Sequence, residues 1–172
     1  MQNLKIICPN GHLGFAPLRT ESFQLGVQAK PDYIAADSGS DDVGPVPLGS
    51  GTSTSPEAWQ RHDLEQMLLA SRKLGVPMII GSAGDTGANS RVDLYVSIIQ
   101  ELARQHGLPR FRVGYFYSEV DKERLRRSMR DDIGLERDEG VELRVGDEAH
   151  LHARPPGVLA YGGLDTNALV HR

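Results

Sequence analysis

The residues best suited to chemistry lie in four short polar segments, each directly after an apolar run. These segments cover residues 9–14, 37–42, 81–89 and 117–119 and are rich in small and polar residues. His12 and Asp85 are suited to moving protons, because imidazole titrates near neutral pH and carboxylates act as acids and bases. Asp37 joins them because it immediately ends an apolar run. We predict catalytic roles for His12, Asp37 and Asp85, and the alternative is that they are turn residues that bond the backbone.

Residues 81–89 form the most distinctive segment, with Gly81, Gly84 and Gly87 in a G-x-x-G-x-x-G spacing. Between a strand and a helix, such glycines allow a tight turn, and N–H groups at the helix start can hold an anion. The spacing matches neither the dinucleotide nor the phosphate-loop motif, so no nucleotide is assigned. The alternative is a structural turn in which Asp85 or Asn89 caps a helix. The predicted substrate-binding residues are Asn10, Ser38, Gly84, Thr86, Asn89, Arg91 and Ser118.

Asp41 and Asp42 are candidate metal ligands, because carboxylates that converge on one crevice can hold Mg²⁺. Solvated turn aspartates are the alternative, and both interpretations stay open. His150 and His152 share one side of a possible strand, but no third ligand accompanies them, so we interpret them as a chance pair. Cys8 ends an apolar run and is expected to be a buried small hydrophobe. No other cofactor is predicted.

Four strands and three helices must position these residues. Residues 4–8, 33–36, 76–80 and 111–116 are short apolar runs bounded by turn residues, which is typical of strands. The first helix has Ser55 as expected N-cap and Pro56 at its first position, and it ends before Gly75. The other helices are expected at residues 90–106 and 121–129, the last with a solvated basic face. The polar residues 61–63 are expected on the polar face of the first helix.

The alternation of strands and helices predicts an α/β fold with a parallel, Rossmann-like sheet of about four strands and flanking helices. Because the runs are apolar on both faces, we expect helices on either side of the sheet. The carboxyl ends of parallel strands meet at one edge, so the four polar segments should line one cleft. We place a domain boundary near residue 134, which divides a core (1–134) from an irregular tail (135–172). Residues 141–145 are a possible edge strand, and the long polar segment 37–54 is expected to be a functional or disordered loop.

Composition excludes several classes of protein. The chain has 172 residues and a net charge of −4, so it lacks the basic footprint of a nucleic-acid or anionic-membrane binder. No apolar run approaches the ~20 residues of a membrane span, and the N-terminal run is too short for a signal peptide. The single cysteine excludes an internal disulfide. We therefore expect a cytoplasmic protein with no nucleic-acid or membrane partner.

Residues 35–93 and 113–125 resemble the N-terminal domain of the acyclic terpene utilisation family (AtuA-like proteins). The distinctive parts are the loop 37–49 and the turn 81–93, and the resemblance covers about residues 4–133. It implies bacterial catabolism of branched acyclic terpenoids and related organic or acyl acids, by proteins that are cytoplasmic and longer than this chain. The resemblance carries no set of catalytic residues. It ends near Ile133, so a site shared with a second half would be incomplete here.

Two functions fit these observations. The first is a lyase, hydratase or isomerase that acts on a small anionic carboxylate or acyl substrate, with His12, Asp37 and Asp85 in proton transfer. The second is a non-catalytic fragment of a larger enzyme that binds an anion or a partner. The irregular tail and a possible open sheet edge also predict association into a homo-oligomer or with a second subunit.

Overall fold

The computed structural model describes residues 3–39, 43–130, 143–145 and 158–161. Helices and strands alternate along most of this length, as the sequence predicts. The helices are α1 (Thr20–Gln28), α2 (Val46–Ser50), α3 (Glu57–Leu74), α4 (Asn89–Gln105) and α5 (Lys122–Arg130). The strands are β1 (Ile6–Ile7), β2 (Tyr33–Asp37), β3 (Met78–Gly81), β4 (Val113–Phe116), β5 (Leu143–Val145) and β6 (Val158–Tyr161).

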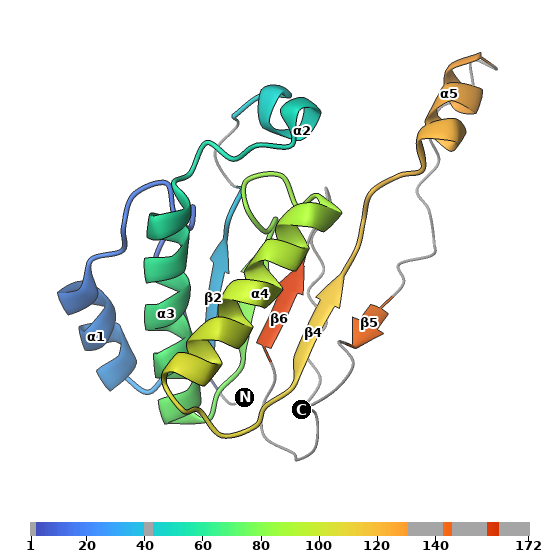
Figure 1. Cartoon of the computed structure of the whole chain (residues 1–172). Coiled ribbons are helices and arrows are strands. Elements are labelled where there is room, and N and C mark those ends of the chain that lie inside the picture. Colours follow the sequence, from blue (N-terminus) through green and yellow to red (C-terminus); the bar gives the residue numbers. More distant parts are fainter. Residues whose placement is uncertain (1–2, 40–42, 131–142, 146–157, 162–172) are drawn as a thin grey trace.

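The strands form one sheet in the order β1-β2-β3-β6-β4-β5. Every pairing is parallel except that of β4 with β5. The first three strands pair in chain order, whereas β6 lies between β3 and β4. The prediction of a mixed α/β fold with a parallel sheet and flanking helices is therefore confirmed. The strands β2, β6 and β4 point to the same end of the molecule, at the top of Figure 1.

The described helices α1, α3 and α4 lie on one face of the sheet. Helices α3 and α4 lie in front of the strands in Figure 1. Helix α1 lies on the same face. A methyl group added to its Gly26 would meet the Ile7 side chain of β1, so the helix packs closely on this strand. Ile7 pairs with Ile34, which is buried on the face that the helices cover. We expected helices on both faces. Successive right-handed crossovers that advance in one direction instead place their helices on the same face.

Burial along the strands follows this one-sided arrangement. In β2, Ile34 and Ala36 are buried, whereas Tyr33 and Ala35 are half-buried. Adjacent β3 shows the same alternation, with Met78 and Ile80 buried against the helices. The core lies between this face and the helices, and its largest fully buried side chains include Tyr95, Leu64, Met67, Leu68, Ile99 and Leu102.

Helices α3 and α4 begin and end within two residues of the predicted limits, and α3 stops at Gly75, which has a left-handed backbone (φ 69°). The start of α3 differs in one respect. Pro56 is the flanking residue, and the Ser55 hydroxyl does not cap the helix but bonds Asp85. Helices α1 and α2 were not predicted. The segment 37–54, expected to be a loop, thus contains one helical turn.

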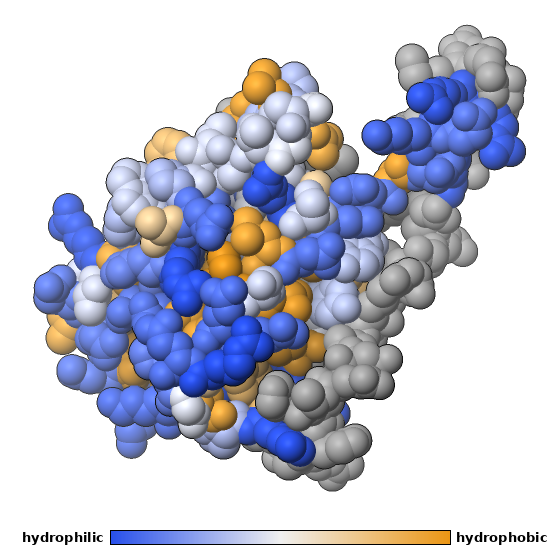
Figure 2. Space-filling model, in the orientation of Figure 1, coloured by the Kyte–Doolittle hydropathy of each residue, from blue (hydrophilic) through white to orange (hydrophobic). Residues whose placement is uncertain are grey.

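Figure 2 shows the hydropathy of the surface over α2 and α5. Hydrophobic surface lies over α2, where Val46 and Leu48 are exposed. Helix α5 extends away from the sheet and is hydrophilic, in agreement with the predicted solvated face. Among the described residues, no helix has both the length and the apolarity needed to cross a membrane.

The predicted tail contributes β5 and β6 to the sheet, so part of it is regular structure. Strand β5 overlaps the possible edge strand at 141–145, of which residues 141 and 142 lie outside the described residues. His150 and His152 also lie outside them. The expectation of a buried Cys8 is wrong: this residue is exposed, because β1 ends before it at the edge of the sheet. The boundary near residue 134 stays a prediction.

Candidate functional site

His12 and Asp85 form a buried pair at the carboxyl edge of the sheet. His12 Nε2 lies 2.9 Å from Asp85 Oδ1, and the two side chains are 3% and 0% exposed. His12 comes from the loop after β1, and Asp85 comes from the turn after β3. The two residues are 73 positions apart in the sequence, and the parallel strands bring them together.

The Asp85 carboxylate also accepts hydrogen bonds from the three residues that precede Pro56. Ser53 Oγ and Thr54 Oγ1 each donate to Oδ2 at 2.8 Å, and Ser55 Oγ donates to Oδ1 at 2.7 Å. The backbone N–H groups of Thr54 and Ser55 add bonds to Oδ2 at 2.5 and 3.2 Å. Together with His12, these donors engage both carboxylate oxygens.

The turn that carries Asp85 has an unusual backbone. Asp85 has φ 70° and Ser82 has φ 45°, values that side chains other than glycine rarely adopt. The Asp85 N–H donates to the Ser38 carbonyl at 2.8 Å, which joins this turn to the end of β2. Gly39 makes the close approach possible, because a Cβ there would lie 2.5 Å from the Asp85 carbonyl oxygen.

The hydrogen bonds decide the charge of Asp85. Burial by itself raises the pKa of this carboxyl, but the bonds from His12 and from residues 53–55 outweigh burial and hold the pKa well below its ordinary value. Asp85 is therefore ionised at neutral pH, and His12 Nε2 carries the proton between them. An ionised carboxylate with both oxygens engaged orients an imidazole and stabilises its protonated form.

Ser38 belongs to a second buried network. Its hydroxyl lies 2.5 Å from the Tyr95 hydroxyl and accepts the Gly84 N–H at 3.3 Å. Both side chains are fully buried, and burial raises the pKa of Tyr95, so the phenol stays neutral. Ser38 and Gly84 thus tie the turn to α4 in the interior. Their predicted contact with a substrate is untested.

Asp37 lies at the same edge, beside Gly81 in the β2–β3 register. Its Oδ1 accepts the Gly39 N–H at 2.9 Å, and the residue is half-buried. Asp41 and Asp42 lie outside the described residues. Within the part of the chain that the structure describes, no three histidine, cysteine or acidic side chains converge as metal ligands do.

The remaining predicted residues of the glycine-rich turn contact protein groups. Thr86 Oγ1 accepts the Ala88 N–H at 3.3 Å, and Arg91 donates to the Gly51 carbonyl. The Asn89 N–H at the start of α4 donates to Glu119 Oε1 at 2.7 Å, so a carboxylate of this chain already lies where an anion was expected. Ser118, half-buried, immediately precedes Glu119.

Asp63 is a functional candidate that sequence reasoning missed. It was assigned to a polar helix face, but it is fully buried and holds the loop after β1. Its carboxylate accepts the N–H groups of Gly14 and Leu18 at 3.1 and 2.9 Å, and the Asn10 amide at 3.2 Å. The contacts are 45 to 53 residues apart, so no local signal indicated them.

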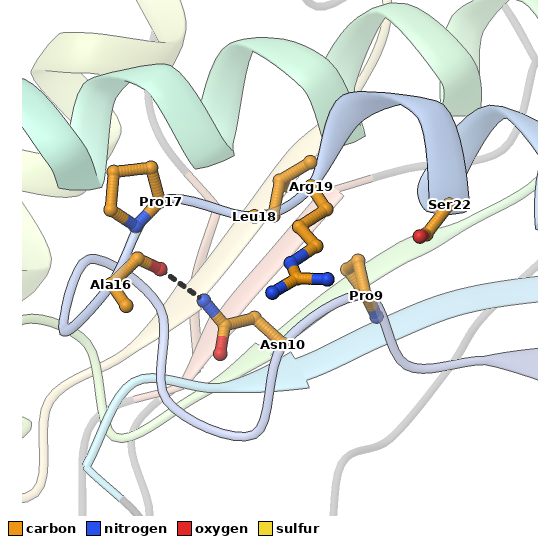
Figure 3. Close-up of a pocket in the computed structure, with 7 residues that line it drawn as sticks. All are labelled: Pro9, Asn10, Ala16, Pro17, Leu18, Arg19 and Ser22. Carbon is orange, nitrogen blue, oxygen red and sulfur yellow. Dashed lines mark hydrogen bonds between the residues drawn. The ribbon is translucent and has the colours of Figure 1, made fainter.

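A pocket opens beside this loop. It is lined by Pro9, Asn10, Ala16, Pro17, Leu18, Arg19 and Ser22 (Figure 3). Its volume of about 260 Å³ lies just below the range of roughly 300–1,000 Å³ typical of drug-sized ligands. Asn10 is the predicted site residue that lines it. The single cleft expected for all four polar segments is therefore not seen in this pocket, which follows β1 alone.

Comparison of the chain with known proteins gives no match that bears on this site. No family model matches the chain, and no curated protein or solved structure matches it. The resemblance to the acyclic terpene utilisation family stays a prediction.

Proposed function

We propose that this chain is the catalytic domain of a lyase, hydratase or isomerase that acts on a small carboxylate or acyl substrate, of the acyclic terpene utilisation type. The observation that carries the proposal is the buried His12–Asp85 pair at the carboxyl edge of a parallel sheet. The proposal covers those lyases, hydratases and isomerases that move a proton to or from a carbon near a carbonyl group. We include in the proposal a Rossmann-like arrangement of the sheet, which the parallel β1-β2-β3 order supports.

In this proposal His12 transfers the proton and Asp85 positions it. Asp85 keeps the ring in one orientation and stabilises the imidazolium that forms. Asp37, at the same sheet edge, is the second acid–base group.

Deuterium exchange tests the proposal with a panel of candidate substrates. The chain is incubated in D₂O with short carboxylates and their acyl thioesters, such as butyrate and butyryl-CoA, and proton NMR follows exchange at the carbon next to the carbonyl. We expect exchange with the native chain and a loss of at least about a hundredfold in His12→Gln. His106→Gln, which changes an exposed histidine at the end of α4, serves as the matched control.

The alternative is a non-catalytic domain that binds an anion or a partner. One observation favours it: His12 is 3% exposed, and Asp85 is saturated with internal hydrogen bonds. A probe that binds while no panel member exchanges deuterium would support this alternative over catalysis.

The cellular setting forms part of the same proposal. We propose a cytoplasmic protein whose partner is a small anionic substrate and which associates with itself or with a second subunit. The position of β1 at the edge of the sheet supports association, because an edge strand presents unpaired backbone groups. Sedimentation velocity over a hundredfold range of concentration checks it, and a concentration-independent monomer would contradict it.

A further inference from the structure

We infer that the pocket beside Arg19 binds the carboxylate of a short-chain organic acid, with the Arg19 guanidinium as the group that pairs with it. The inference rests on the proposed function for the class of substrate. It departs from the sequence prediction in the place of binding, which moves from the turn at residues 84–91 to the loop after β1.

Arg19 is the only charged residue among the seven that line the pocket. Its side chain is exposed and makes no hydrogen bond or ion pair within the described residues. Figure 3 shows the guanidinium extending into the space between Asn10 and Pro9. A guanidinium presents a planar fork of donors that matches a carboxylate. The pocket therefore supplies one unpaired positive charge and no acidic side chain of its own.

The neighbouring amide donors are already engaged, so Arg19 is the charged group of the lining that is left to recognise a carboxylate. The Asn10 amide donates to the Ala16 carbonyl at 2.7 Å and to Asp63. The N–H groups of Gly14 and Leu18 donate to the same buried carboxylate. Asp63 is thus satisfied by bonds on the inner side of the loop, and it does not line the pocket.

The rest of the lining sets the size and polarity of the ligand. Pro9, Ala16, Pro17 and Leu18 form an apolar wall suited to a short hydrocarbon chain. The Ser22 hydroxyl faces the same space in Figure 3. A volume of about 260 Å³ matches a small acid.

The loop also connects the pocket to the proposed proton-transfer residue. Asn10 lines the pocket, and its Oδ1 accepts the backbone N–H of His12 at 3.3 Å. An acid bound to Arg19 is therefore held by the same loop that carries His12. This link joins the two sites in one short segment of chain.

NMR titration with defined probes tests the inference on the full chain. Sodium butyrate is compared with n-butanol, which keeps the hydrocarbon but lacks the charge, and with inorganic phosphate. We expect butyrate to shift the amide signals of Asn10 and Ser22, and n-butanol and phosphate to bind at least about tenfold more weakly. Phosphate binding as tight as that of butyrate would overturn the assignment to a short-chain acid.

Two variants distinguish binding of butyrate in this pocket from its nonspecific attraction to exposed positive charges. We expect Arg19→Gln to raise the Kd for butyrate at least about tenfold, while Arg104→Gln, an exposed arginine on α4, leaves it unchanged. Equal affinity in both variants would overturn the inference. Deuterium exchange distinguishes it from the proposed function. If butyrate binds at Arg19 but no deuterium exchange occurs, the proposed catalysis is wrong and the pocket assignment is kept. If exchange is intact in Arg19→Gln, the pocket assignment is wrong and the proposed catalysis is kept.

Discussion

A buried carboxylate is costly unless its oxygens accept hydrogen bonds, and Asp85 meets this condition with donors from His12 and residues 53–55. The left-handed backbone at Asp85 adds strain that these contacts must offset. The same residue joins three segments: the loop after β1, the segment before α3 and the turn after β3. Its effect on stability should therefore exceed that of an ordinary turn aspartate.

Replacement of Asp85 by alanine should reduce the free energy of unfolding by about 3–5 kcal/mol, because it leaves buried donors without an acceptor. Glu21→Gln, on an exposed acid of α1, should change it by less than about 0.5 kcal/mol. Urea denaturation measures both. A loss below about 1 kcal/mol in Asp85→Ala would show that the network contributes little.

The lowered pKa of Asp85 predicts a pH dependence of stability. The folded-state pKa lies below the unfolded value of about 3.9, so the stabilisation is complete above that value and is lost as the pH falls through the folded pKa. In Asp85→Asn the slope of stability against pH below about pH 4 should be shallower. Parallel slopes in native and variant chains would assign the dependence to other carboxyl groups.

Gly14 is a position where the fold leaves no room for a side chain. It has φ 81°, and a Cβ would lie 2.3 Å from Gln60 Cγ and 3.1 Å from the Gln60 backbone. Gly14→Ala should destabilise the chain by about 1–3 kcal/mol or more from overpacking and strain. Gly11→Ala is the matched control, since nothing lies within 4 Å there. Thermal denaturation compares the two, and equal melting temperatures would contradict the packing.

The sequence predicted the residues at strand ends better than their partners. His12 and Asp85 could be singled out because each follows an apolar run, and the structure places them together. Their hydrogen-bonding partners at residues 53–55, and the role of Asp63, depend on contacts tens of residues apart. A pattern of helical or strand periodicity contains no such information, so these contacts required the fold.

At the scale of elements, α3 does more than cover the sheet. Asp63 on its buried side holds the loop after β1 by three donors, and this loop carries both His12 and the pocket. The helix thereby determines the path of the loop. Asp63, which we predicted on the polar face of this helix, is therefore the buried contact between α3 and the loop after β1.

Asp63→Ala should therefore loosen the loop specifically. We expect faster amide hydrogen exchange at Gly14 and Leu18, whose N–H groups lose their acceptor, with a loss of about 3 kcal/mol or more in stability. Gln66→Ala, a half-buried residue on the same helix, is the control. Unchanged exchange at both amides would show that the loop holds its path without Asp63.

The prediction of helices succeeded where the apolar periodicity and a helix-ending glycine indicate the same limits. Helices α3 and α4 have long apolar faces and end near glycines, so their limits were close to those observed. Helix α1 contains Gly26 and has only two buried residues, Phe23 and Val27, a pattern too short to detect. The placement of the described helices α1, α3 and α4 on one face followed from strand order, which local pattern does not determine.

At the scale of the whole molecule, β6 connects two parts of the sheet. It pairs with β3 on one side and β4 on the other, and β3 and β4 do not adjoin in the strand order. A chain shortened to end at residue 156 lacks this strand, whereas one shortened to end at residue 161 keeps it. The first should lose more than about 3 kcal/mol, a large part of the roughly 5–15 kcal/mol typical of a domain. Guanidinium denaturation compares them, and equal midpoints would exclude a central role for β6.

The central place of β6 also sets an order on biosynthesis. Strands β1, β2 and β3 can pair in the order in which they are made, because each neighbours the one made just before it. Strand β4 emerges next and can pair with β5, but it joins β3 only through β6, and translation at roughly 5–20 residues per second separates Phe116 from Tyr161 by several seconds. During that interval the outer edge of β3 presents unpaired backbone groups to its surroundings. The nascent chain is therefore most open to chaperones, and to aggregation, while the residues between β4 and β6 are being made.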